Sequence, residues 1–134
     1  MDRKTARAQA MKLIYEWEMG GDGGEETRLG LLEIAPGEEE TDFMNALAEG
    51  VKQNADALDE KIAGFLRGWT LERLTRVDLA ILRLAAYELM YTETPRGIVI
   101  NEAVDLANRF STDKAGSFVN GVLGNLARSL EENA

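Results

Sequence analysis

The sequence contains no cysteine and no histidine, and it has only two prolines in 134 residues. These absences exclude disulfides, thiol nucleophiles, zinc sites of the usual ligand set and histidine acid–base catalysis. No apolar run approaches the roughly 20 residues that a membrane-spanning helix needs, and the charged start does not resemble a signal peptide. We therefore expect a cytoplasmic protein without cofactors or membrane contact, folded as a single domain over residues 1–134 because a chain of this length buries a sizeable core.

Positive charge is also scarce, since the net charge is −9. The imbalance is local: residues 16–60 carry a net charge of −12, residues 1–15 carry +3, and residues 61–134 are neutral overall. A polyanion responds to the local field rather than to the total charge. The acidic composition therefore does not exclude a nucleic-acid partner at the N-terminal end of the chain.

Apolar residues recur at helical spacing along most of the chain, and no alternating pattern typical of a strand has useful length. Asp2 is placed to cap a first helix, and the glycines that start at Gly20 end it. The spacing then predicts a weak helix over 25–34 and two consecutive helices over 41–66, separated near Asn54.

The segment 79–91 differs from the others because only Arg83 and Glu88 in it are not apolar. A helix that is apolar on all sides, yet too short to cross a bilayer, belongs at the centre of a bundle. Pro95 and Gly97 are expected to end it, and two amphipathic helices follow. The predicted fold is a compact all-α bundle of about seven helices.

Two groups of residues resemble catalytic patterns. Ser111 and Lys114 have the Ser-x-x-Lys spacing of penicillin-recognising enzymes, but the partner motifs of that class are absent. The segment lies between two helices, and Ser111, Thr112 or Asp113 can cap the last helix, which explains these residues without chemistry. Glu102 and Asp105 lie three apart on one helical face, where a solvated polar surface explains them without chemistry. We predict that the protein is not an enzyme.

The basic residues Arg3, Lys4 and Arg7 lie in the first two turns of the first helix, where the helix dipole disfavours cations. Their spacing of three and four residues places them on one face, opposite the apolar stripe. A surface of this kind fits phosphate groups. The alternative is a solvated basic start without a function.

Four segments carry a resemblance to a known family: TARAQAMKLIYEWEM near the start, DLAILRLAAYELMY in the centre, and INEAVDLANRFS and FVNGVLGNL near the end. In this order they resemble the NusB family of transcription antitermination factors over nearly the whole chain. The segment from Gly20 to Glu40 matches weakly. The resemblance implies an all-helical fold of two packed three-helix halves around a shared long helix.

The resemblance also implies a function and a set of RNA-binding residues. Family members bind the boxA element of nascent ribosomal RNA transcripts together with NusE, a small-subunit ribosomal protein, and help RNA polymerase pass terminators. Carried over to this chain, the RNA-binding residues would be Arg3, Lys4, Arg7, Lys114, Phe118 and Asn120. Phe118 could stack on a base or belong to the core, and Gly121 could allow close helix packing.

The partner-binding residues implied by the family are Tyr15, Met19 and Asp78, the last as an exposed acid facing a basic ribosomal protein. The expected partners are single-stranded RNA with boxA, NusE and the antitermination complex of RNA polymerase, while a homodimer stays open. A protein-binding adaptor of the same fold, with weak or no RNA affinity, is the main alternative. The same helical module also occurs in rRNA cytosine methyltransferases, but the glycine-rich cofactor loop of those enzymes is absent from this sequence.

Overall fold

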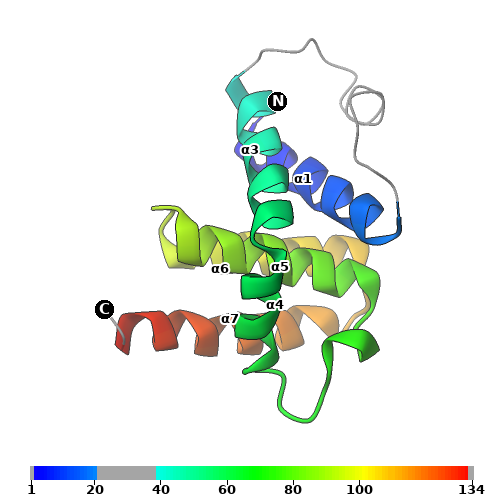
Figure 1. Ribbon diagram of the computed structural model, residues 1–134, viewed down its shortest axis with the longest axis vertical. Helices are drawn as coiled ribbons and strands as arrows, with labels where there is room; N and C mark the ends of the chain where they lie inside the picture. The colour runs from blue at the N-terminus through cyan, green and yellow to red at the C-terminus, as the bar shows by residue number, and fades with distance from the viewer. Residues whose placement is uncertain (1, 21–38, 133–134) are drawn as a thin grey trace.

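A computed structural model describes residues 2–20 and 39–132 of the chain (Figure 1). These residues form six α-helices, one short 3-10 helix and no strand. The elements are α1 (Arg3–Glu18), α3 (Glu39–Gln53), α4 (Ala55–Ala63), η1 (Leu71–Arg73), α5 (Arg76–Tyr91), α6 (Arg96–Phe110) and α7 (Ala115–Glu132). The predicted all-α bundle is confirmed, with a helix number close to the expected seven, and the helix predicted over 25–34 lies outside the described residues.

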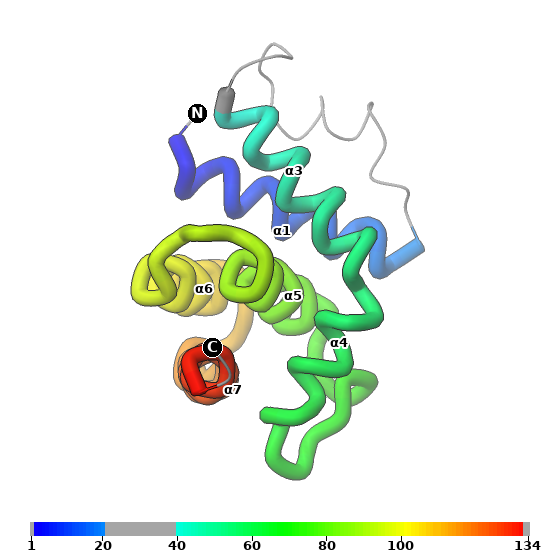
Figure 2. The backbone as a smooth tube through the Cα atoms, turned by 60° about the vertical axis from the view of Figure 1, so that its left-hand side comes forward, coloured from blue at the N-terminus to red at the C-terminus, as the bar shows by residue number. Residues whose placement is uncertain are grey.

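Helix α5 lies at the centre and contacts the other five α-helices of the described chain. Figure 2 shows α1 and α3 on one side of the pair formed by α5 and α6, α7 on the opposite side, and α4 alongside α5. The two ends of the chain thus pack against opposite sides of one helix. Any surface built from both ends depends on how α5 is held.

The sequence of α5 explains its central place. All residues from Asp78 to Ala86 are buried, as expected for a helix that is apolar on nearly all sides. Two charged residues farther along α5 are buried as well: Arg83 is 7% exposed and Glu88 is 2% exposed. Buried charges need partners, and these two find them on α1 and α4. No described helix is long and apolar enough to cross a membrane.

Some helix ends follow from local chemistry, and one expectation about them was wrong. Asp2 Oδ1 accepts a backbone N–H of the first turn of α1 at 2.7 Å, and Gly20, just past the end of α1, has a φ of +98°, which only glycine adopts easily. Asn54 separates α3 from α4 as predicted. Pro95 precedes α6, but Gly97 lies inside the first turn of α6. The prediction that Gly97 helps to end the central helix was therefore wrong. Gly97 belongs to the next helix, because one glycine in a first turn does not prevent a helix from forming.

Close helix packing at glycine occurs at positions other than the expected one. A Cβ atom at Gly50 of α3 would overlap the ring of Tyr87 on α5, and one at Gly116 of α7 would overlap the side chain of Asn108 on α6. A Cβ atom at Gly121 would meet nothing within 4 Å. The expectation that Gly121 serves a close helix approach was wrong, since Gly121 lies on the exposed side of α7.

Candidate nucleic-acid interface

The first turn of α1 presents two exposed cations. Arg3 Nε lies 3.0 Å from Glu40 Oε2, and its guanidinium lies 3.8 Å from the centre of the Phe43 ring. Lys4 Nζ lies 3.2 Å from Asp105 Oδ2, on α6. The side chains of Arg3 and Lys4 are 48% and 52% exposed, and ion pairs this exposed contribute little to stability. Phosphate oxygens could therefore replace the carboxylates at small cost.

Arg7 does not share that exposed face. It is 7% exposed, and its Nε and Nη2 atoms donate to the Glu88 carboxylate at 2.9 and 3.0 Å. The prediction of one basic face formed by Arg3, Lys4 and Arg7 was wrong in its geometry, because α1 is packed against both α3 and α5. The side of α1 that carries Arg7 faces α5, so this cation neutralises a buried acid instead of facing solvent.

The turn between α6 and α7 places Ser111 against the central helix. The Ser111 hydroxyl donates to Asp78 Oδ1 at 2.6 Å, and Ser111 follows the last residue of α6. Two predictions are corrected here. Ser111 closes α6 and binds α5, so its hydroxyl is not a cap of α7. Asp78 is 8% exposed and is held by this hydrogen bond, so it is not the exposed acid that we expected.

A cavity of about 310 Å³ opens beside this turn. The start of α7 and the segment that links α4 to α5 form its walls. The lining residues are Trp69, Arg73, Leu74, Thr75, Asp78, Thr112, Lys114, Ala115 and Phe118. The structure therefore brings together three residues predicted from the sequence, Asp78, Lys114 and Phe118, around one hollow.

Phe118 is half-buried and serves two surfaces. It packs against the hydrophobic core, and it also lines both the 310 Å³ cavity and a neighbouring cavity of about 320 Å³ bounded by Phe65 and Trp69. One part of the Phe118 side chain therefore belongs to the core, and another part stays accessible in the cavities. Lys114 is exposed one turn before it.

Asn120 lies apart from this cavity. It is exposed and lines a polar depression of about 330 Å³ between α6 and α7, together with Asn101, Asn108 and Asp113. Three of its lining residues carry amide side chains, and amides hydrogen-bond the edges of bases. The candidate RNA residues near the C-terminal end of the chain thus occupy two separate hollows of α7.

The candidate partner residues on α1 lie at its C-terminal end. Tyr15 is half-buried against the core, whereas Met19 follows the helix and is 59% exposed. An exposed methionine is a common element of protein-binding surfaces. Asp78 contributes to the cavity rather than to an exposed acidic surface.

A network of charges fixes this end of α1 against α5 and α4. Glu18 accepts from Arg76 at 2.9 Å and from Arg83 at 2.7 Å, and Arg83 also pairs with Asp59 of α4 at 2.8 Å. Arg76 donates in addition to the carbonyl oxygens of residues 71 and 74 at 2.9 and 2.8 Å. Glu18 thus holds the segment that carries one wall of the cavity.

These contacts change the acidity of Glu18. Partial burial alone would raise the pKa of Glu18, but hydrogen bonds and charge attraction from Arg83 and Arg76 outweigh it and hold the pKa below its ordinary value of 4.5. A carboxyl group with a lowered pKa in the folded state stabilises the fold above its unfolded pKa. This contribution is lost as the pH falls through the folded value.

We therefore expect Glu18→Gln to destabilise the protein most above pH 4.5. Below that pH the difference from the wild type should shrink, because the wild-type carboxyl group also becomes protonated. Denaturant unfolding at a series of pH values measures this difference. Glu60→Gln, which changes an exposed carboxylate on α4, is the matched control and should show little dependence. A constant deficit for Glu18→Gln from pH 7 to pH 3 would contradict the assignment.

Sequence reasoning missed Trp69 and Arg73. They belong to the segment RGWTLER, which has no helical stripe and therefore offers no periodicity to interpret. The segment offers no other local signal for the position of the tryptophan ring. Only the folded structure shows that this ring and Phe118 share a cavity.

Comparison with known proteins agrees with this fold and its features. A model of the NusB family matches residues 4–128. The transcription antitermination protein NusB of Bacillus subtilis (strain 168) is 43% identical, covering 99% of this chain and 100% of that protein. The protein of the same name from Clostridium botulinum (strain Kyoto / Type A2) is 37% identical, with 94% and 99% covered.

Solved structures show the same architecture. The structure of T. maritima NusB matches with a TM-score of 0.82 at 30% identity, covering 96% of this chain and 92% of that one. The crystal structure of antitermination factors NusB and NusE in complex with dsRNA matches with a TM-score of 0.84 at 27% identity, with 95% and 96% covered.

Proposed function

Because the chain belongs to the NusB family, we propose that it is a transcription antitermination factor that binds RNA together with a NusE-type ribosomal protein. The RNA would be the boxA element of nascent ribosomal RNA, and the complex would join RNA polymerase to promote passage through terminators. A protein of the same fold has been crystallised with NusE and double-stranded RNA, which supports NusE and RNA as the classes of partner.

The observation that carries the RNA-binding part is the position of the exposed cations. The chain has a net charge of −9, yet Arg3 and Lys4 are about half exposed at the start of α1, and Lys114 is exposed at the rim of a cavity lined by aromatic rings. Lysine and arginine supply the phosphate contacts that dominate affinity for nucleic acids. Arg7 is not part of this surface, because Glu88 already neutralises it.

We propose that the protein partner docks at the C-terminal end of α1, on exposed Met19 and on the accessible part of Tyr15. Asp78 would act indirectly, by holding Ser111 and the turn before α7. In this arrangement the partner and the RNA occupy different parts of the molecule, so each can bind without displacing the other.

Replacing Arg3, Lys4 and Lys114 together with alanine should weaken binding of boxA RNA and flatten its salt dependence. The slope of log affinity against log salt should fall by about 0.7 for each lost phosphate contact of single-stranded RNA, or about 2 for the three. Affinities at several salt concentrations, with and without NusE, measure this slope.

The matched control removes the same number of positive charges elsewhere. Lys61, Arg96 and Arg128 lie on α4, α6 and α7 outside the proposed surface, and changing them to alanine should leave the slope nearly unchanged. Equal losses in both triple variants would show a general effect of charge and would contradict the assigned surface. If the wild-type protein binds NusE but does not distinguish boxA from scrambled RNA in any condition, the protein is an adaptor and the RNA-binding function is wrong.

A further inference from the structure

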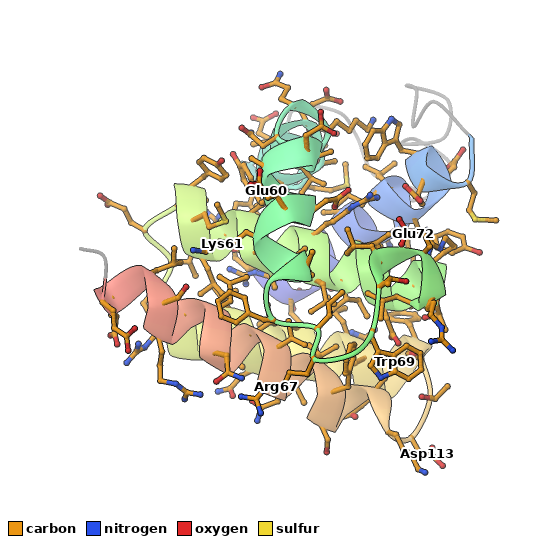
Figure 3. All side chains as sticks on the ribbon, turned by 60° about the horizontal axis from the view of Figure 1, so that its bottom comes forward. Glu60, Lys61, Arg67, Trp69, Glu72 and Asp113 are labelled. Atoms are coloured by element: carbon orange, nitrogen blue, oxygen red, sulfur yellow. The ribbon has the colours of Figure 1, made fainter. Side chains whose placement is uncertain are left out.

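Trp69 is exposed on a loop whose backbone has two residues with positive φ directly before it. Its side chain is 52% exposed, although burying a ring of this size would be favourable. The two preceding residues, Arg67 and Gly68, have φ values of +30° and +86°, and the Trp69 N–H donates to the Leu66 carbonyl at 2.9 Å. Figure 3 shows Trp69 on this loop, on the side where α7 begins. The loop therefore presents the ring beside α7 instead of placing it in the core.

Hydrogen bonds from Arg76 also hold the end of this loop in place. The guanidinium group of Arg76 donates to the carbonyl oxygens of Leu71 and Leu74, at 2.9 and 2.8 Å, and to Glu18. These bonds attach the end of the loop to both α1 and α5. A ring held on an anchored loop loses little conformational freedom when it binds a ligand.

Trp69 and Phe118 come from different elements and line one cavity of about 310 Å³, which is at the small end of the range for ligand pockets. Two cations line the same cavity: Lys114, and Arg73, whose guanidinium lies 5.3 Å from the centre of the Trp69 ring. The acid that lines it, Asp78, already accepts a hydrogen bond from the Ser111 hydroxyl. The cavity thus combines two aromatic rings with two positive charges.

We propose that this cavity takes one unstacked base of single-stranded RNA, stacked on Trp69 on the side of Phe118, with Arg73 and Lys114 contacting the adjacent phosphates. This proposal rests on the proposed RNA-binding function and adds Trp69 and Arg73 to it. Proteins read single-stranded RNA largely by stacking splayed bases on aromatic rings beside cations. Paired cations at the rim favour a polyanion over an apolar peptide segment as the occupant.

The test combines a protein variant with a set of RNAs that each lack one base. An abasic site is placed at each position of a boxA RNA in turn, which leaves every phosphate in place. The wild-type protein should lose about 5- to 150-fold in affinity at one position, the range for loss of one stacked base. Trp69→Ala should bind the intact RNA with a similar loss and should be insensitive to that one abasic position. Trp69→Phe, which keeps a ring, should retain most of the affinity and the sensitivity.

A second measurement reads the ring directly. The chain has two tryptophans, so Trp17→Phe leaves Trp69 as the single indole. Its fluorescence should be quenched by the intact RNA and much less by the RNA that lacks the stacked base. Circular dichroism and thermal unfolding of each variant check that the fold is kept.

The possible outcomes distinguish the proposed base pocket from the proposed RNA-binding function. If Lys114→Ala weakens RNA binding while Trp69→Ala matches the wild type, RNA binding stands and the base pocket is wrong. If Trp69→Ala lowers affinity equally for all abasic RNAs, Trp69 acts only through the fold, and the pocket is again wrong. Loss of NusE binding by Trp69→Ala without RNA would assign the cavity to the protein partner. A wild-type protein that binds no RNA would overturn both proposals.

Discussion

Replacing Arg7 with alanine should lower the free energy of unfolding by about 3–5 kcal/mol, the usual cost of removing one partner of a buried ion pair. The reason is the acid left behind. Glu88 is 2% exposed and receives three hydrogen bonds from the Arg7 side chain. Without them a charged carboxylate would keep only the long hydrogen bond from the Thr94 hydroxyl, at 3.5 Å, and a protonated one would form at a cost in free energy. Chemical denaturation followed by circular dichroism measures the loss.

The double variant Arg7→Met with Glu88→Leu is the matched control. It removes both charges and keeps side chains of similar size, so it should recover most of the stability, because well-packed apolar groups often replace a buried ion pair without loss. Arg7→Ala is also expected to reduce RNA binding only as far as it unfolds the protein. If Arg7→Ala were as stable as the wild type but had lost RNA affinity, Arg7 would have to be assigned to the RNA-binding surface.

Most of the fold was predictable from residue spacing. The apolar stripes of α1, α6 and α7 and the all-apolar α5 appear where the sequence places them, because helical periodicity reflects burial directly. The burial of the charged residues was harder to predict. Arg3 and Arg7 have the same chemistry and lie on the same helix, and only the contact with Glu88, 81 positions away, makes one of them buried. Glu88 itself was the missed signal, since an acid within an apolar central helix needs a cation.

The candidate site was predictable only in part for a similar reason. The prediction of Lys114 and Phe118 follows from the resemblance to the family. Asp78 and Ser111, in contrast, are 33 positions apart in the sequence and meet through a hydrogen bond that only the fold forms. Trp69 lies in a segment without periodicity, so no local pattern indicates where its ring lies. Contacts of this kind depend on how helices pack, and spacing along a single helix does not contain that information.

The second large effect is expected at Arg83, which connects three helices. Its guanidinium pairs with Glu18 of α1 at 2.7 Å and with Asp59 of α4 at 2.8 Å, and it lies 5.7 Å from the centre of the Trp17 ring. Arg83→Ala should lower the free energy of unfolding by about 3 kcal/mol, toward the lower end for a buried pair. The lower end applies because the side chains of Glu18 and Asp59 keep 23% and 24% exposure and water can partly solvate them.

One companion variant, together with the pH dependence of Arg83→Ala, locates the cause of this loss. Asp59→Asn removes one charge while Arg83 keeps Glu18, so it should cost clearly less than Arg83→Ala. In Arg83→Ala, Glu18 keeps only Arg76 from the network, so its pKa should rise toward the ordinary value and the acid sensitivity assigned to Glu18 should weaken. Unfolding measured at pH 7 and at low pH for all three proteins tests both points. An Arg83→Ala protein as stable as the wild type at pH 7 would show that apolar packing alone holds α1 and α4 against α5.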